Sequence, residues 1–247
     1  MKTIHDDLGH LVALASPPRR VVSLVPSLTE ALEETSPGIV VGATDYCIEP
    51  SELVVTRVRG TKNPDLDAIK ALRPDLVVAN QEENRRVDVD RMRAMGLDVW
   101  VTKIDSVDEA LVSLTRLFDD VLESHPDWLE AAKEVWAEPS RLELTAALPI
   151  WRDPWIVVGG HTYSSDLLAK LGIRNYFEDR SRYPQVELAE IRQAPLVILP
   201  DEPYPFSQTD GPECFEKCVL IDGRATAWYG PAMVWSRSYL EEAITTG

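Results

Sequence analysis

The chain has 247 residues, 45% of them hydrophobic, which is enough for one large globular domain or two small ones. Its 41 acidic residues outnumber its 25 basic ones, so the formal net charge is −16. This charge repels nucleic acids and anionic lipid surfaces, and no stretch approaches the roughly 18 apolar residues of a membrane span. The composition therefore argues against a nucleic-acid partner and against direct membrane insertion.

The N-terminal segment, MKTIHDDLGHLVALASPPRR, has acidic residues where a secretion signal has basic ones, and its apolar stretch is short. If Met1 is the native start, the sequence as written predicts a cytoplasmic protein. The cysteines, Cys47, Cys214 and Cys218, are irregularly spaced and do not indicate a disulfide framework. Cys214 and Cys218 could face each other across one helical turn, but without a further ligand nearby they predict no metal site.

In the first half of the chain, short runs rich in Val and Ile alternate with segments of helical period. This alternation is typical of parallel strands joined by crossover helices. Strands are predicted at 20–25, 39–43, 75–79 and 97–101, and helices at 27–34, 66–72 and 87–95. We expect these elements to form an N-terminal α/β lobe over residues 1–104.

The middle of the chain, residues 105–140, is predicted to be a helical linker that includes an inter-lobe backbone helix. Its apolar residues have helical spacing, and Ser106 is placed as the N-cap. Pro126 interrupts the pattern and fits the first position of a second helix.

Strand-like runs return at 142–150, 156–158 and 196–199, with a helix at 164–171, so residues 141–247 are predicted to form a C-terminal α/β lobe. LDAIKALRPDLVVANQEEN, from Leu66, and LAEIRQAPLVILPDEPY, from Leu188, share the order helix, turn, strand and polar loop. This repetition indicates that the lobes share a plan. Ligands of open parallel sheets bind beyond the carboxyl ends of the strands, so we expect both polar loops to line one ligand cleft between the lobes.

The two polar loops supply the first candidate ligand-binding residues. NQEENRR, residues 80–86, contributes Glu82, Asn84 and Arg85, although it could equally be a solvated loop with an N-cap. PDEPYPF, residues 200–206, contains three prolines that stiffen the backbone. It is expected to display Glu202, Tyr204 and Phe206 with little ordering entropy left to lose.

Further candidates lie in loops close to the predicted strands. TDYCIEP follows a strand and contributes Tyr46 and Cys47, while GTKNPD contributes Lys62 and Asn63. Asp65, in the same segment, is interpreted as a helix cap. Aromatic residues are concentrated in the second half, and RATAWYGPAM places its rings in a loop suited to stacking on a flat ligand. The aromatic candidates from this half are Tyr163, Tyr183, Trp228 and Tyr229.

Catalytic signals are weak. His161 lies near Ser164 and Asp166, but no G-x-S-x-G elbow is present, and neither G-x-G-x-x-G nor G-x-x-x-x-G-K occurs. We therefore predict a binding protein that is not an enzyme, with no catalytic residues, no cofactor and no bound metal of its own.

Four segments together carry a family resemblance: RVVSLVPSLTEAL, LRPDLVVAN, GLDVW and YPQVELAEI. In this order they resemble the type III solute-binding proteins of ABC importers, also called helical-backbone metal receptors, and most closely their cobalamin-binding branch. The resemblance implies two Rossmann-like lobes joined by a long helix, with a ligand held between them.

The resemblance also implies roles for individual residues. Tyr46, Tyr183 and Trp228 match aromatic positions of the ligand site, whereas a further family tryptophan falls at Thr61 here. Asp67 and Glu190 match the acidic residues that dock on the importer permease. The implied function is capture of a corrinoid, haem-like or other metal-chelate ligand for an ABC importer, and the implied location is extracytoplasmic.

Two other interpretations stay open. A cytoplasmic offshoot of the family could bind a smaller charged solute as a sensor, because the polar loops carry more charge than a corrinoid needs. A chelatase-like enzyme on the same architecture would instead need His161 and a carboxylate to converge in the ligand site.

Overall fold

The computed structural model describes residues 2–246, which form two compact units. Unit 1 comprises residues 2–104, 109–130 and 229–231. Unit 2 comprises residues 105–108, 131–228 and 232–246. Each unit contains parallel strands and helices, so the predicted α/β fold class is confirmed.

Unit 1 is built on a five-stranded parallel sheet with the order β5-β4-β3-β8-β9. Its strands are β3 (Val21–Ser23), β4 (Val40–Ala43), β5 (Thr56–Arg57), β8 (Leu76–Asn80) and β9 (Val99–Thr102). All four strands predicted in the first half are confirmed. β8 is buried along its whole length, as expected for a central parallel strand covered on both faces.

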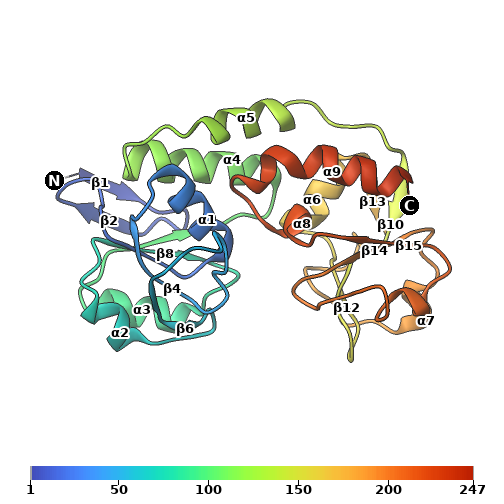
Figure 1. The fold of residues 1–247 in the computed structure, drawn as a ribbon, viewed down its shortest axis with the longest axis horizontal. Helices are drawn as coiled ribbons and strands as arrows, with labels where there is room; N and C mark the ends of the chain where they lie inside the picture. Colours follow the sequence, from blue (N-terminus) through green and yellow to red (C-terminus); the bar gives the residue numbers. More distant parts are fainter. Residues whose placement is uncertain (1, 247) are drawn as a thin grey trace. The chain divides into compact units, whose positions relative to one another are not determined.

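The helices of unit 1 cover this sheet. The helices within the first hundred residues are α1 (Pro26–Thr35), α2 (Leu66–Ala71) and α3 (Arg86–Ala94). Ile69 of α2 and Met92 of α3 join Val77 in one buried cluster. Figure 1 shows α2 and α3 on one side of the sheet, with α4 (Val107–Thr115) on the other. A short hairpin, β6 (Arg59–Gly60) and β7 (Asn63–Pro64), precedes α2.

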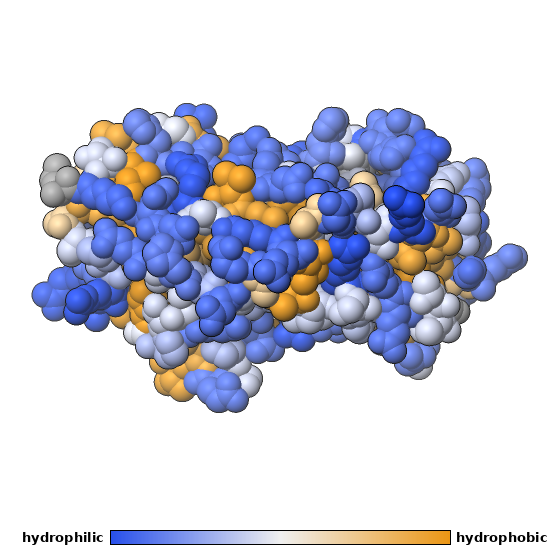
Figure 2. All heavy atoms as spheres, turned by 90° about the horizontal axis from the view of Figure 1, so that it is seen from above, coloured by the Kyte–Doolittle hydropathy of each residue, from blue (hydrophilic) through white to orange (hydrophobic). Residues whose placement is uncertain are grey.

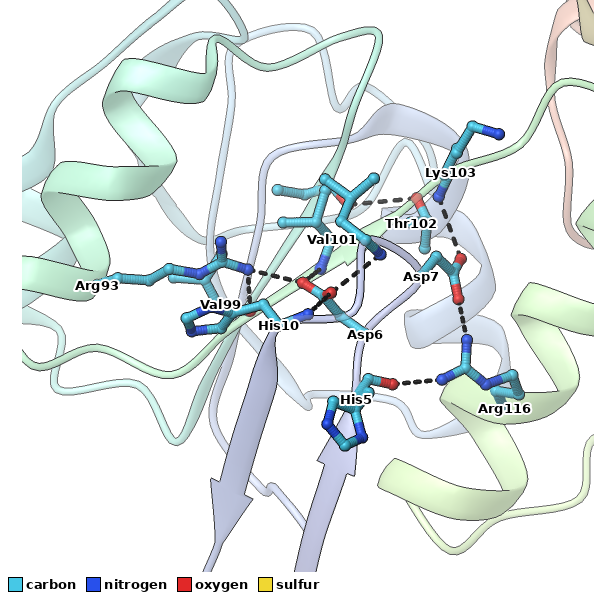
Figure 3. Close-up of polar contacts among 12 residues, drawn as sticks. His5, Asp6, Asp7, His10, Arg93, Val99, Val101, Thr102, Lys103 and Arg116 are labelled. Atoms are coloured by element: carbon cyan, nitrogen blue, oxygen red, sulfur yellow. Dashed lines mark hydrogen bonds and ion pairs between the residues drawn. The ribbon is translucent and has the colours of Figure 1, made fainter.

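An antiparallel N-terminal hairpin of β1 (Lys2–His5) and β2 (Leu11–Leu14) was not predicted. Its turn is fixed by Asp6, whose carboxylate accepts hydrogen bonds from the backbone N–H groups of Leu8 and His10. Asp6 also pairs with Arg93, and the neighbouring Asp7 accepts from Arg116, as Figure 3 shows. Both aspartates therefore fasten the hairpin to the rest of unit 1.

The predicted helical middle is present, but it is not one continuous α-helix. α4 runs into a π-helical turn at Arg116–Val121, in which the N–H of Leu122 donates to the carbonyl of Leu117. α5 (Asp127–Trp136) then begins one residue after Pro126, as the proline predicts.

In unit 2, parallel pairing joins β10 (Leu144–Ala146) with β13 (Ile173–Asn175), and β14 (Val197–Pro200) with β15 (Cys218–Ile221). A parallel bridge between Ala147 and Val197 links the two pairs. β11 (Pro149–Trp151) and β12 (Ile156–Val157) form an antiparallel pair. β13 and β15 were not predicted.

The helices that lie wholly within unit 2 include α6 (Tyr163–Lys170), α7 (Leu188–Ile191), α8 (Arg224–Ala227) and α9 (Ala232–Thr246). Figure 1 shows α6, α8 and α9 on one side of the β14–β15 pair and α7 on the other. The repeat expected between the two halves is visible within each unit, since α2 leads into β8 and α7 leads into β14.

Hydrophilic residues cover most of the face drawn in Figure 2, in keeping with the high charge. Apolar residues are exposed between them, which is usual for a globular protein. Among residues 2–246, none of the helices has the length and apolarity needed to cross a membrane.

Candidate functional site

In unit 1 the strand order changes direction at β3, because β4 lies on one side of it and β8 on the other. Open α/β sheets bind ligands at such a switch point, outside the carboxyl ends of the strands. The segments that follow β4 and β8 therefore carry the candidate site of unit 1. They contain Tyr46 and the loop 81–85.

Two asparagines shape the loop after β8. The side-chain oxygen of Asn80 accepts from the backbone N–H of Glu82 at 2.8 Å and from that of Glu83 at 3.2 Å. The side-chain amide of Asn84 donates to the carbonyls of Leu24 and Thr61. Asn84 is buried, so it holds the loop rather than facing a ligand. Asn80 was missed as a structural residue because nothing local distinguishes it from a solvated asparagine.

Tyr46, Lys62 and Glu82 come together at this edge. The Tyr46 side chain is 64% exposed. A Cβ atom placed on Gly60 would lie 3.3 Å from the Tyr46 ring, so the ring rests against the β6–β7 hairpin. From the same hairpin, Lys62 Nζ donates to the carbonyl of Glu82 at 2.5 Å. Asn63, in β7, is exposed.

Cys47 and Tyr229 are buried in unit 1, although both were predicted to contact a ligand. Burial raises the pKa of the Cys47 thiol, which lies 3.1 Å from the Thr44 hydroxyl. Burial also raises the pKa of Tyr229. Side chains enclosed in this way stabilise the unit and are not offered to a ligand.

Arg85 remains exposed, but it has a partner within the chain. Its Nε lies 2.7 Å from the carboxylate of Asp88 in the first turn of α3. The position of Arg85 is therefore explained equally well by an ordinary helix start, which is the alternative interpretation of this loop, and by a contact with a ligand.

In unit 2, Glu202 and Trp228 lie together where the β14–β15 pair ends. The Trp228 indole lies near the Glu202 carboxyl, and the Glu202 side chain is half-buried. Burial is the main cause that raises the pKa of Glu202, and the Trp228 indole opposes it. Tyr163 is buried beneath, with its hydroxyl 3.4 Å from the carbonyl of Trp228.

Arg224 belongs to the same group, although the sequence did not single it out. Its guanidinium lies 6.0 Å from the Trp228 ring and 5.8 Å from the Trp235 ring, within reach of cation–π attraction. It also pairs with Asp222 at 2.7 Å. The four-residue spacing from Arg224 to Trp228 across α8 is the one sequence signal that could have indicated it.

Tyr204 and Phe206 follow Glu202, but their rings turn into the unit 2 core. Phe206 is 3% exposed and stacks on Trp155 with ring centroids 6.0 Å apart. The Tyr204 hydroxyl donates to Asp210 at 2.7 Å. The prediction that this loop displays three side chains is wrong for Phe206, because its ring gains more from burial beside Trp155 than from exposure.

Tyr183 is the exposed aromatic residue of unit 2 among the candidates, at 36% exposure. The Arg182 guanidinium lies 6.0 Å from its ring and pairs with Asp105 at 3.1 Å. The Tyr183 ring is therefore exposed beside a guanidinium whose charge is paired with Asp105.

The two predicted docking residues differ in their surroundings. Asp67 is exposed in the first turn of α2. Glu190 forms a capping box with Glu187 and an ion pair with Arg180, and the hydrogen bond from Arg180 lowers its pKa. Helix capping alone thus explains why a glutamate is present at position 190. Asp67 has no comparable contact with another side chain among the described residues.

The structure corrects the interpretation of two cysteines. Cys214 ends a short 3₁₀ helix and Cys218 begins β15, so they do not share a helical turn. Within residues 2–246 there is no group of three His, Cys, Asp or Glu side chains that could hold a metal ion. His161 is exposed, and its carbonyl accepts from Arg182.

A surface cavity of ≈ 370 Å³ lies elsewhere in unit 1 and contains none of the candidate residues. Its lining residues are Lys2, Leu14, Ala15, Ser16, Pro17, Val121 and Glu123. Lys2 and Glu123 pair across it at 3.8 Å. We do not assign it to the candidate site, because it lies away from the carboxyl ends of the strands.

Known proteins resemble this chain in both sequence and fold, although no family model matches it. The vitamin B12-binding proteins of Yersinia pestis and Yersinia pseudotuberculosis are 26% identical to it, over 73% of this chain and 68% of theirs. These relatives agree with the cobalamin-binding branch named from the sequence.

Solved structures of the same architecture superpose closely. The periplasmic vitamin B12-binding protein of Vibrio cholerae gives a TM-score of 0.71 at 17% identity, covering 92% of this chain and 98% of that one. A periplasmic haem-binding protein of Pseudomonas aeruginosa gives 0.73 at 16% identity, with 92% and 94% covered. A Helicobacter pylori protein solved as a nickel–histidine complex gives 0.77 at 15% identity, with 99% and 90% covered. In sequence and fold, the chain resembles the solute-binding proteins that the sequence motifs indicated.

Proposed function

We propose that this chain is a solute-binding protein that captures a corrinoid, haem-like or other metal-chelate ligand without chemical turnover. The observation that carries the proposal is the sequence similarity to vitamin B12-binding proteins over most of the chain, together with the fold shared with vitamin B12-binding and haem-binding proteins. The relatives and the Vibrio cholerae and Pseudomonas aeruginosa proteins named above are binding proteins, which supports capture rather than catalysis.

The proposed contacts are the exposed or half-buried side chains at the carboxyl ends of the strands in each unit. In unit 1 these are Tyr46, Lys62 and Glu82; in unit 2 they are Tyr183 and Glu202. Aromatic faces stack on a flat macrocycle, and the polar groups fix its orientation. We leave Cys47, Asn84, Tyr163, Phe206, Trp228 and Tyr229 out of the proposed contact set because they are buried within their own units.

Isothermal titration of the chain with cyanocobalamin, dicyanocobinamide, haemin and a ferric siderophore tests this function. We expect one of these probes to bind, and Tyr46→Ala to weaken that binding about tenfold through loss of one stacking contact. Tyr176→Ala, which removes another exposed tyrosine outside these loops, is the matched control and should bind like the unchanged chain. If none of the probes binds, the proposed ligand class is wrong.

We further propose that the chain delivers its ligand to an ABC importer from outside the cytoplasmic membrane, as its periplasmic neighbours suggest. Asp67 and Glu190 are the proposed docking residues. Cross-linking of the chain to the permease in membranes should fall when Asp67→Arg and Glu190→Arg are combined, and remain when the exposed Asp90 of α3 is changed to Arg. Retention of full cross-linking by the double variant would show that these two residues are not the docking residues, whereas no cross-linking of the unchanged chain would support a sensor without a transporter.

A further inference from the structure

A tight turn after β4 presents two large apolar side chains where the strands of unit 1 end. Tyr46 is 64% exposed and Ile48 is 60% exposed, while Cys47 between them is fully buried. The backbone N–H of Ile48 donates to the carbonyl of Tyr46 at 3.0 Å, which closes a three-residue turn around Cys47. Single apolar residues are common on protein surfaces, but two of them on one turn at the ligand-binding edge of a sheet indicate a contact surface.

One guanidinium group holds the backbone of this turn. Arg57, at the end of β5, donates from Nη1 to the carbonyl of Thr44 at 2.9 Å and to that of Cys47 at 2.7 Å. Its Nη2 donates to the carbonyl of Leu53 at 3.4 Å. Among residues 2–246 no carboxylate pairs with Arg57, so its partners are these backbone carbonyls. The planar fork of N–H donors allows one side chain to fix separate points of a loop.

The Cys47 side chain holds the same turn from the core. Its Sγ lies 3.1 Å from the Thr44 hydroxyl and 4.0 Å from the carbonyl of Ser23 in β3. The Cys47 N–H also donates to the carbonyl of Thr44 at 3.1 Å. Because the turn is fixed on both sides, it can present its exposed side chains with little conformational entropy left to lose on binding.

We propose that Ile48 is a further ligand contact beside Tyr46, and that Arg57 is the positioning residue that holds both on the ligand's side of the turn. This inference rests on the proposed function. Neither the Ile48 side chain nor the Tyr46 ring face carries a charge, so the part of the ligand that they meet is apolar. The face or the alkyl-substituted edge of a macrocycle fits this surface, whereas its ionised groups do not. Arg57 does not touch the ligand and acts only through the turn.

Titration calorimetry of the full chain with cyanocobalamin, dicyanocobinamide and haemin tests the contact. Ile48→Ala should weaken binding of whichever probe binds by about tenfold, because the burial of several methyl and methylene groups is lost. Val112→Ala, at a 62% exposed position of α4, is the matched control and should bind like the unchanged chain. Equal affinities for Ile48→Ala and the unchanged chain would overturn the proposed ligand contact.

The positioning role of Arg57 is tested with the same probe. Arg57→Met should weaken binding severalfold, and Arg57→Lys should not restore it, because an ammonium group cannot reach all three carbonyls at once. Arg57→Met combined with Ile48→Ala should weaken binding by less than the product of the single losses, since Arg57 acts through the turn that carries Ile48. Losses that multiply would overturn the positioning role. Arg59→Met, which removes an exposed guanidinium paired with Asp65 at 3.4 Å, is the control and should bind like the unchanged chain.

A measurement without ligand separates this inference from the proposed function. Amide hydrogen exchange should rise at Cys47 and Ile48 in Arg57→Met, because both N–H groups donate within the turn that Arg57 holds. Arg59→Met should leave this exchange unchanged. Unchanged exchange in Arg57→Met refutes the positioning role even if a ligand binds. If the exchange rises but no probe binds the unchanged chain, the positioning role stands, the proposed ligand class is wrong, and the Ile48 contact fails with it.

Discussion

The Asp6 carboxylate lies 2.6 Å from the Arg93 guanidinium, which joins the N-terminal hairpin to the end of α3 within unit 1 (Figure 3). The Asp6 side chain is fully buried and also accepts from backbone N–H groups of its own turn. A buried carboxylate with this many donors serves as a structural anchor.

Asp6→Ala should destabilise the chain by about 3 to 5 kcal/mol, because it leaves the Arg93 charge inside unit 1 without its partner. Urea unfolding followed by circular dichroism measures the change. Asp90→Ala, which removes an exposed carboxylate from the Arg86 pair on α3, should cost less than about 1 kcal/mol. Similar losses for the two variants would contradict the anchoring role of Asp6.

Asn84→Ala should loosen the loop after β8 and cost about 1 to 3 kcal/mol, since the carbonyls of Leu24 and Thr61 lose their donor. Hydrogen exchange should rise at Glu82 and Glu83, and ligand affinity should fall even though Asn84 itself is buried. Unchanged exchange in this loop would show that Asn80 alone suffices to hold it.

Burial of Cys47 predicts a loss of stability in alkaline solution. Its pKa is higher in the folded chain than the ordinary value of 9.0, so its contribution is complete below pH 9.0 and is lost as the pH rises through the folded pKa. Urea unfolding above and below pH 9.0 should show a smaller alkaline loss for Cys47→Ala than for the unchanged chain. Cys218→Ala is a useful comparison, because Cys218 is only partly buried and its pKa is also raised.

The pair of Arg152 and Glu213 in unit 2 gives a prediction for acid. The hydrogen bond from Arg152, at 2.6 Å, lowers the pKa of Glu213 from 4.5 to about 2. Because the pKa of Glu213 is lower in the folded chain, its ionised carboxylate stabilises the folded state above pH 4.5. This stabilisation is lost as the pH falls toward about 2. Arg152→Met should return the Glu213 midpoint toward 4.5 in carboxyl NMR titrations, and a midpoint that stays near 2 would assign the shift to other donors.

Much of the secondary structure of unit 1 could be predicted because its strands are marked by short apolar runs in the sequence. The run from Leu76 to Ala79 is apolar throughout, and the sheet buries all of it, since parallel strands are covered on both faces. Turn residues indicate where helices begin, and Pro126 lies directly before α5. The positions of Tyr46 and Glu82 at strand ends followed from the same pattern.

Other features depend on partners far away in the sequence. The β1–β2 hairpin is held by Arg93, 87 residues from Asp6, and short strands with no strong alternation give no local signal of it. In the same way, the sequence marks Glu202, Phe206 and Trp228 as loop residues but cannot say which of them face inward.

The sequence by itself determined the α/β class, the alternation of strands and helices, and the strand ends at which ligand contacts are expected. Only the tertiary structure decided that Asn84 supports its loop, that Phe206 stacks on Trp155, and that Trp228 lies near Glu202. Backbone pattern is a local property set by apolar periodicity, whereas burial and charge at a side chain depend on residues that folding brings near.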